Sequence, residues 1–585
     1  MKYEFSFEHP NRQLIDIKYT IENVTEKELI VNLPAWRPGR YELGNFAKNI
    51  QKLQVIDGDG NALKFWKTKK DSWTIATEGK STVVLRYTYY GADLNAGSTY
   101  LDEHQLYVNP VNCCMYVPQR MLEPCALQLH VPADYKIACD LPLLATDENV
   151  RVATDFHRLA DAPFIASNKL QHNAIEVNSH TFHLWFMGIV QLDWVKLNTD
   201  FERFCAEQLQ TMGNLPGKEY HFLFQILPVF FYHGVEHTYS TVCALGPGET
   251  LFNTPFYDEL LGVSSHELFH AWNVKTIRPT DMLPYNYEQE NYSSLGWVYE
   301  GITTYYGDQF LLRSGVFDFK RWAQTFDDKL KKHFTNYARF TQPVAEASFD
   351  TWLDGYVPGI PHRKTSIYTE GSLISFVLDG IIRQHSNNVH SLDDIMRKLY
   401  ADAQAGLGYS KKVLIAHLNS LVSYDFEGFY EQHIEQTASL EPHLKEQLEK
   451  LGMELQVHLP YNKLEHKAGM LLLEINGFTT LQNIAPDAPA EVSGLMIGDQ
   501  IIAINSLKVK NNLLALWNEA EEFEVEVYTK SGRTKTVKIK LGTENYFEGR
   551  KVALLEQATE TQQTNWVAWS KQAYPKPITF DNNLK

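Results

Sequence analysis

The sequence predicts a multidomain α+β protein, and three observations point to this class. Its 585 residues are enough for three or four domains of about 150 residues each. Short stretches rich in Val, Ile, Tyr and Thr alternate with turn signals over residues 1–188, which predicts an N-terminal β-sandwich-like domain. Over 189–440 apolar residues recur mainly at helical spacing, and strand-like segments return in 445–542. We therefore expect three domains, followed by a polar C-terminal tail over 543–585.

Each expected element follows from a local pattern. In the first domain, residues 14–24 and 81–90 are typical of strands, and Asp57-Gly58-Asp59-Gly60 is typical of a turn. In the second domain, the expected helices cover 201–212, 255–277, 295–314 and 317–334, and the expected strands cover 220–227 and 239–245, the latter a candidate edge strand. In the third domain, strands are expected at 470–475, 501–504 and 522–528, with a short helical insert at 485–495.

Composition restricts the partners and the compartment. The formal net charge is −17, so the surface should repel the phosphate backbone of nucleic acids and anionic lipid. No run reaches the roughly 18 apolar residues of a membrane helix, and the N-terminus lacks the basic and apolar regions of a signal peptide. Six cysteines in 585 residues fit buried thiols in a reducing compartment better than a disulfide framework. We expect a cytoplasmic protein with neither a nucleic-acid nor a membrane partner.

The strongest chemical signal is an H-E-x-x-H motif. His266 and His270 lie four residues apart on an expected helix and so share one face, where two imidazoles can meet one Zn²⁺. Glu267 lies between them and is the candidate general base for water activated by the metal. Thr254 is the expected N-cap, Pro255 the first helical residue, and the helix should stop before Pro279.

A hydrolytic zinc site needs a third protein ligand and one open position. Glu300 on the expected helix 295–314 supplies a carboxylate, and it lies beside the apolar stripe of that helix. Ser293 or Ser294 is the candidate N-cap of this helix. Taken alone, Glu300 fits a solvated helix glutamate better; the upstream histidines make it a ligand candidate.

These segments resemble the glycyl aminopeptidase family of gluzincin zinc metallopeptidases. Residues 266–275 with Arg278-Pro279 are similar to the extended zinc helix of that family, and 297–306 resembles its glutamate-ligand helix. The resemblance implies an N-terminal β domain, a thermolysin-like catalytic domain over 189–440 and a C-terminal PDZ domain. It also implies one Zn²⁺ per chain held by His266, His270 and Glu300, with Glu267 as the base.

Two further segments resemble the substrate-binding parts of the family. His233-Gly234-Val235-Glu236-His237 looks like the cleft strand whose glutamate binds the free α-amino group, which implies Glu236 and Gly234 as substrate-binding residues. Read without the family, Glu236 fits an exposed strand end. The segment 366–374 resembles the one in which a tyrosine stabilises the oxyanion, which implies Tyr368; here Glu370 stands where the family commonly has lysine.

The third domain resembles a bacterial PDZ domain. Residues 451–455 look like its carboxylate-binding loop, and 484–490 with 494–499 look like the segment before its central strand. Backbone N–H groups in such a loop can hold a peptide C-terminus, while an extended peptide adds as a strand. A domain of this shape that only packs on the catalytic domain is the alternative.

Together these features predict a zinc metallopeptidase, more narrowly an aminopeptidase that removes N-terminal residues from peptides with a free N-terminus. The family resemblance implies small first residues, Gly or Ala. Two alternatives remain open: a zinc endopeptidase in which Glu236 is only structural, and a PDZ peptide-binding scaffold with a vestigial peptidase domain.

Overall fold

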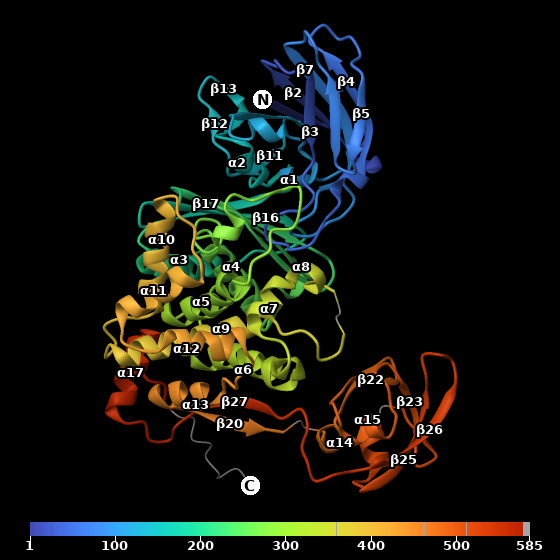
Figure 1. Ribbon diagram of the computed structural model, residues 1–585, viewed down its shortest axis with the longest axis vertical. Coiled ribbons are helices and arrows are strands. Elements are labelled where there is room, and N and C mark those ends of the chain that lie inside the picture. The colour runs from blue at the N-terminus through green and yellow to red at the C-terminus, as the bar shows by residue number, and fades with distance from the viewer. Residues whose placement is uncertain (358–359, 460–461, 511, 577–585) are drawn as a thin grey trace.

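The computed structural model describes residues 1–357, 360–459, 462–510 and 512–576. Figure 1 shows a β-rich body at the N-terminus, a helical body in the middle, and a smaller β-rich body that follows it. This arrangement confirms the multidomain α+β class. Within these residues, none of the helices has both the length and the apolar character needed to cross a membrane.

The N-terminal β domain contains a seven-stranded sheet in the order β12-β13-β10-β1-β2-β7-β4, a four-stranded sheet β11-β14-β9-β8 and a three-stranded sheet β3-β6-β5. Alternating side chains of β2, Ile15, Ile17, Tyr19 and Ile21, are buried in its core. The elements are β1 (Lys2–Ser6), β2 (Leu14–Glu22), β3 (Glu28–Asn32), β4 (Ile50–Asp57), β5 (Phe65–Lys69), β6 (Ser72–Ala76), β7 (Thr82–Tyr90), β8 (Tyr100–Leu101), β9 (Leu106–Val108), α1 (Pro110–Cys113), β10 (Cys125–His130), β11 (Lys136–Cys139), β12 (Leu143–Leu144), β13 (Asp147–Ala153), α2 (Phe156–Ala160) and β14 (Phe164–Ser167).

The structure places the first domain boundary earlier than residue 188. β15 (Gln171–Val177) and β16 (His180–Gly188) belong to the sheet of the second domain, whose order is β15-β16-β17-β19-β18. β16 pairs in parallel with β17 (Glu219–Ile226) along its length. β15 and β16 alternate buried apolar residues with polar ones, as the strands of the N-terminal domain do, so local pattern alone does not separate the two domains.

The expected strands at 220–227 and 239–245 correspond to β17 and β19, but the expected edge is wrong. β19 (Ser240–Gly246) lies inside the sheet, and β18 (Phe231–Glu236) ends the strand order. β18 runs antiparallel to β19, with Gly234 opposite Cys243. The edge of this sheet therefore carries Gly234 and Glu236.

Helices cover the second domain and share one large hydrophobic core that includes Phe201, Phe269 and Phe310. They are α3 (Trp194–Met212), α4 (Phe256–Phe269), the π-helix η6 (Trp297–Ile302), α5 (Thr303–Arg313), α6 (Phe319–Thr335), α7 (Val344–Phe349), α8 (Thr351–Asp354), α9 (Ile367–His385), α10 (Leu392–Gln404), α11 (Lys411–Leu421), α12 (Phe426–Tyr430) and α13 (Glu441–Lys450).

The C-terminal β domain is shorter than expected. Its sheet runs β21-β22-β23-β25-β26 with β24 on β23, and it has its own core. Its elements are α14 (Lys463–Ala468), β21 (Met470–Ile475), β22 (Phe478–Ile484), α15 (Pro489–Val492), β23 (Gln500–Ile504), β24 (Leu507–Lys508), α16 (Leu513–Trp517), β25 (Glu522–Tyr528) and β26 (Thr534–Lys540).

The segments that flank this domain belong to the helical body. β20 (Met453–His458) pairs with β27 (Gly549–Leu554), and Met453 and Val552 are part of the helical core. Residues 451–455, expected to form a carboxylate-binding loop, therefore lie outside the sheet of the C-terminal β domain. The expected polar tail also contains α17 (Glu560–Ser570), which buries Trp566 and Trp569 in the same core.

Candidate metal and peptidase site

α4 carries the H-E-x-x-H motif and is shorter than expected. It begins at Phe256, with Pro255 rather than Thr254 at the N-cap position, and ends at Phe269, ten residues before Pro279. His270 is the C-cap residue, and the backbone N–H of Lys275 donates to the His270 carbonyl at 3.0 Å. The chain thus turns directly after the second histidine.

This turn fixes the orientation of His270. Nδ1 lies 2.6 Å from the carbonyl oxygen of Asn273. Because a carbonyl only accepts hydrogen bonds, Nδ1 carries a proton, so Nε2 is the nitrogen that can give up its proton and bind a metal. Nε2 of His266 lies 3.0 Å from Nε2 of His270. Burial lowers the pKa of His266 well below its usual value, with the charge of His270 acting in the same direction, which favours the neutral imidazole that binds metals.

Asn273 joins the end of α4 to the next part of the site. Its Nδ2 donates to the carbonyl of Val298 at 3.0 Å and to Oγ1 of Thr303 at 3.1 Å. Thr303 in turn donates to the carbonyl of Asn273 at 3.1 Å. These fully buried bonds hold α4 against η6, the helix that contains Glu300.

Glu300 lies within a π-helical segment rather than the regular α-helix expected from the sequence. π-helical turns often occur at functional sites. The segment packs closely on α9: a Cβ added to Gly301 would lie 2.4 Å from Cα of Gly371, and one added to Gly371 would lie 2.6 Å from the carbonyl oxygen of Trp297. The two glycines therefore allow backbone-to-backbone contact between η6 and α9.

The three predicted metal ligands come together. Oε2 of Glu300 lies 3.8 Å from Nε2 of His266 and 3.4 Å from Nε2 of His270. Tetrahedral Zn²⁺ with ligand bonds of about 2.1 Å separates its ligand atoms by about 3.4 Å. The separations among these three ligand atoms, 3.0, 3.4 and 3.8 Å, lie around that value. Two imidazoles and one carboxylate are also a donor set that suits zinc, so these residues fit the expected ion.

Glu300 and His270 each shift the pKa of the other. Burial raises the pKa of Glu300, and the nearby His270 opposes that shift. Burial disfavours the charged form of His270, but Glu300 outweighs it and raises the His270 pKa to about 10. A buried carboxylate thus lies against the imidazoles, as a cation site requires.

Glu267 lies directly beside the edge strand. A Cβ added to Gly234 would lie 2.1 Å from Oε1 of Glu267, so only glycine fits opposite this carboxylate. Its Oε2 is buried and has no hydrogen-bond partner within the described residues. Burial raises the pKa of Glu267 well above its usual value, and the charges of Glu236 and Glu300 add to the shift while His270 opposes it.

Glu236 ends β18 and lies in the same cluster. Carboxylate oxygens of Glu236 and Glu267 and a nitrogen of His270 all lie within 4.8 Å of one another. The Glu236 side chain lies against Gly39 of the N-terminal domain, where an added Cβ would be 2.4 Å from Oε2. Its Oε1 is buried and lacks a partner in the described part of the chain. A buried carboxylate oxygen without a hydrogen-bond partner favours the binding of a cationic ligand.

Tyr368 faces this group of charges from the first turn of α9, where Ser366 caps the helix. Burial raises the Tyr368 pKa well above its usual value, and the Glu300 and Tyr356 side chains add to this shift. The phenol therefore keeps its proton and is available as a hydrogen-bond donor.

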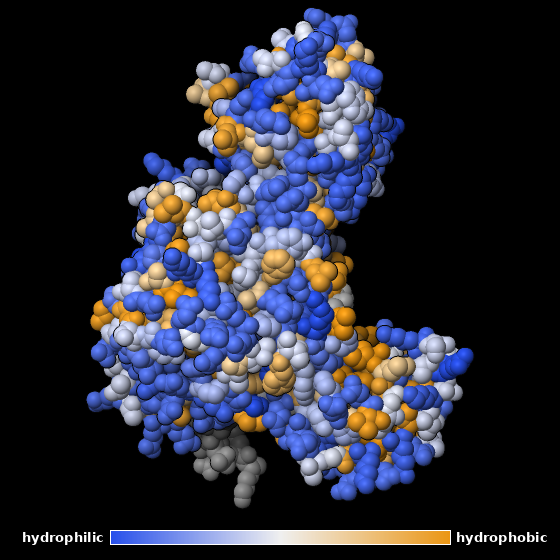
Figure 2. Space-filling view, viewed as in Figure 1, coloured by the Kyte–Doolittle hydropathy of each residue, from blue (hydrophilic) through white to orange (hydrophobic). Residues whose placement is uncertain are grey.

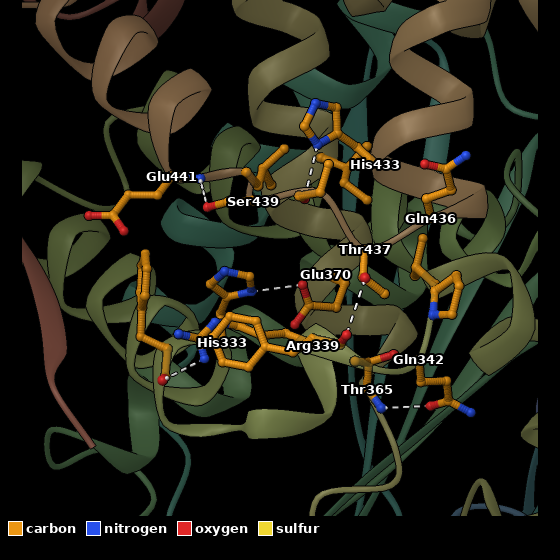
Figure 3. A pocket seen from close by; sticks show the side chains of 17 residues that line it. His333, Arg339, Gln342, Thr365, Glu370, His433, Gln436, Thr437, Ser439 and Glu441 are labelled. Atoms are coloured by element: carbon orange, nitrogen blue, oxygen red, sulfur yellow. Dashed lines mark hydrogen bonds and ion pairs between the residues drawn. The ribbon is translucent and has the colours of Figure 1, made fainter. Parts of the chain in front are cut away.

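Glu370, two residues further along α9, lines a separate cavity of about 260 Å³. Figure 3 shows it directed toward His333, whose Nδ1 lies 2.7 Å from Oε2 of Glu370. This contact links α9 to α6. The carboxylate of Glu370 thus has an interhelical partner.

The sequence indicates no role for Tyr41 or Arg37, but the structure brings both to the site. The Tyr41 hydroxyl donates to Oε1 of Glu300 at 3.3 Å. Arg37 is buried, and the charge of Glu236 supports its protonated form against burial, which lowers its pKa. Both come from residues 34–41 of the N-terminal β domain, a segment rich in Pro, Trp and Arg. This unusual composition is the feature of the sequence that marks the segment.

Two family models match the chain. The Peptidase M61 N-terminal domain matches residues 2–168, and M61 glycyl aminopeptidase matches residues 259–374, which include the motif, Glu300 and Tyr368. No curated protein matches the sequence. The family matches support a metallo-aminopeptidase.

A solved structure shares the fold. A structure from Idiomarina loihiensis, described as an aminopeptidase N family protein, aligns with a TM-score of 0.88 at 24% identity and covers 97% of this chain and 99% of that chain. A mutant M1 zinc metallopeptidase from Deinococcus radiodurans, bound to a Tyr-Ser-Ala substrate, aligns with a TM-score of 0.45 at 14% identity over 75% of this chain and 94% of that chain.

Proposed function

We propose that this protein is a zinc aminopeptidase of the M61 type. One observation carries the proposal: a His266, His270 and Glu300 cluster with zinc-ligand spacing lies next to a buried glutamate, Glu236, whose Oε1 lacks a partner in the described residues. The first feature suits metal-assisted hydrolysis, and the second suits the binding of a substrate ammonium group. The matching family models support the same reading.

The metal ligands are His266, His270 and Glu300, and a bound Zn²⁺ would supply Lewis acidity and lower the pKa of water. Glu267 is the general base. Its carboxylate takes the proton of the attacking water and returns it to the leaving amine, a role that suits its burial beside His270 and its unpartnered oxygen.

Glu236 and Tyr368 act on the substrate itself. Glu236 pairs with the free α-ammonium group, which internal peptide nitrogens lack, and so restricts cleavage to the first peptide bond. Gly234 lies on the edge strand β18, whose backbone is available to bind the substrate, and it lets the Glu267 carboxylate lie directly against that strand. Tyr368 donates its phenolic proton in a hydrogen bond to the oxygen that becomes negative during attack, a charge present only near the transition state.

The resemblance to glycyl aminopeptidases supports a preference for small first residues, Gly or Ala. The experiment compares glycyl and alanyl p-nitroanilides with their N-acetylated forms, with and without a zinc chelator. The free-amine substrates should be cleaved only when zinc is present, and the acetylated ones should resist. Glu267→Gln should retain about one zinc per chain yet lose roughly 10²–10⁴-fold in kcat. Near-normal turnover of this variant would refute the proposed base.

The acetylated substrates also separate the alternative function. An endopeptidase does not need the α-ammonium group, so it would cleave blocked and free substrates alike. Glu236→Gln sharpens the test, because an aminopeptidase should lose most of its discrimination against blocked substrates, whereas an endopeptidase would change little.

We also propose that the C-terminal β domain binds extended peptides, as a PDZ domain does. β21 ends its strand order. The backbone N–H of Leu472 donates to Glu465 of α14 at 2.7 Å, so the part of this edge beyond Leu472 is where a peptide strand can add. Leu473 and Ile475 of β21 and Phe478 of β22 are exposed, and Figure 2 shows apolar surface gathered on this domain. A scaffold with a vestigial peptidase domain would bind such peptides but contain no zinc, so metal analysis separates that alternative.

A further inference from the structure

A second polar cavity lies where α2 and its neighbouring loops meet the second domain, near the seam visible in Figure 1. Its volume is about 240 Å³, whereas one water molecule takes about 30 Å³ of the liquid. Residues of both domains line it. The strong cations among them are Arg37, Arg158, Lys275 and Arg278, and the carboxylates are Asp155 and Asp161.

Two of the four cations already have partners. Nζ of Lys275 lies 2.7 Å from Oδ1 of Asp161, and Nη2 of Arg158 lies 2.9 Å from Oδ1 of Asp140. Asp161 is fully engaged, because its Oδ2 also accepts from the backbone N–H of Thr238 at 2.9 Å and from the Thr238 hydroxyl. Lys275, the strongest influence after burial, holds the pKa of Asp161 far below its usual value. This carboxylate has no capacity left for a further cation.

The other two cations have no ion pair among the described residues. Nη2 of Arg278 donates to the carbonyl of Lys275 at 2.9 Å, and its guanidinium lies 3.8 Å from the centre of the Tyr285 ring. Arg37 is 5% exposed, and its Nη1 donates to the carbonyl of Pro38 at 3.4 Å. The lining of the cavity therefore carries more positive than negative charge, and of its four cations Arg37 and Lys275 are buried.

Two residues of the lining each have one nitrogen atom that is buried behind the cavity wall and has no partner in the described part of the chain. Nε2 of His237 and Nη1 of Arg158 are buried and lack hydrogen-bond partners within the described residues. His237 is 4% exposed, and its Nδ1 contacts Asp161 at 3.1 Å. Buried polar groups of native proteins are normally satisfied, so the wall of the cavity is short of hydrogen-bond partners.

We propose that this cavity binds a small oxyanion, a phosphate or a carboxylate, between Arg37 and Arg278. A guanidinium presents paired N–H donors that match the oxygens of either group. The stacking of Arg278 on Tyr285 and its bond to a backbone carbonyl hold one such donor set in place. The ligand balances the excess positive charge of the lining residues.

Arg37 links the anion cavity to the proposed amine-binding residue. The charge of Glu236 supports the protonated form of Arg37, so the two side chains interact electrostatically. An anion bound to Arg37 reduces the positive potential at Glu236 and strengthens its attraction for an ammonium group. This consequence rests on the proposed aminopeptidase function: the KM for a glycyl substrate should fall as the anion is added.

The binding test does not depend on that function. The zinc-loaded full chain is titrated calorimetrically with inorganic phosphate and, separately, with succinate, at constant ionic strength set with sodium chloride. At least one anion should bind at a single site, and the comparison identifies its class. Arg278→Gln should weaken that affinity at least tenfold. Arg203→Gln removes the same charge from an exposed position of α3 and should leave the affinity within twofold of the original.

Two results would overturn the proposal: no binding of either anion by the original protein, or equal affinity in Arg278→Gln. The second result would assign the binding to another site, such as the metal. If Arg278→Gln does not fold, Arg278→Lys keeps the charge and removes the paired donors, and it should still weaken binding several-fold. A KM that does not respond to a bound anion would contradict only the link to Glu236.

Discussion

Tyr41 shows how a single residue connects the metal site to a distant part of the chain. Its hydroxyl donates to Oε1 of Glu300, while Oε2 of the same carboxylate faces the two histidines. The backbone N–H of Tyr41 donates to the Tyr356 hydroxyl at 3.3 Å. Hydrogen bonds to the second oxygen of a metal ligand fix its direction. The N-terminal β domain thus contributes to the orientation of Glu300.

Replacing Tyr41 by Phe should therefore weaken zinc binding. Loss of such a supporting bond typically costs about 10–100-fold in metal affinity or activity. Competition with a chromogenic chelator measures the affinity, and Tyr528→Phe, at an exposed position of the C-terminal β domain, is the matched control. If Tyr41→Phe and the control held zinc equally well, Tyr41 would have no role in orienting Glu300.

At the scale of elements, the contact between η6 and α9 places Glu300 near Tyr368. Gly301 and Gly371 let the two backbones touch, and Ser348 of α7 accepts from the backbone N–H of Trp297 at 3.1 Å. Side chains at either glycine would push the helices apart, and the carboxylate would move away from the histidines of α4.

Gly301→Ala should therefore destabilise the protein by about 1–3 kcal/mol, the usual cost of overpacking, and reduce its zinc content. Gly262→Ala is the control, because it lies in α4 and an added Cβ there meets nothing within 4 Å. That change should stabilise by up to about 1 kcal/mol through helix propensity. Thermal unfolding and metal analysis measure both effects. If Gly301→Ala unfolded at the same temperature as the original protein, close contact between η6 and α9 would not be needed for stability.

Sequence patterns could predict elements whose signal is local. The spacing of His266 and His270 and the strand composition of 220–227 are examples. The π-helical form of η6 depends on its contact with α9, and the early end of α4 depends on the partners of Asn273 in η6. Neither feature can be predicted from the spacing of apolar residues along the chain. β15 and β16 lie in the second domain, not in the first as their strand pattern predicts, because pairing with β17 determines which sheet they join.

At the scale of the whole molecule, the C-terminal β domain is an insertion. β20 leads into it and β27 leads out, and these strands pair with each other, His458 opposite Gly549. The helical core resumes beyond it: Trp569 donates to the Tyr305 hydroxyl at 3.0 Å and its carbonyl accepts from Gln309 at 2.9 Å. The segment expected to be a tail is therefore part of the helical body.

Replacing residues 459–548 by Asn-Gly should thus leave a folded, zinc-binding peptidase. Asn-Gly favours the two-residue turn that joins antiparallel strands, and the described residues of the large helical core all lie outside the removed segment. The deletion removes the His362 bond to the carbonyl of Ile484 at 2.7 Å and a small apolar cluster around Phe547, both at the periphery of the helical body. Turnover of glycyl p-nitroanilide should stay within several-fold of the full chain, and binding of extended peptides should disappear. A loss in kcat above 100-fold with zinc still bound would mean that the His362 bond and the Phe547 cluster also hold the loop beside Tyr356 and Tyr368 in its active position.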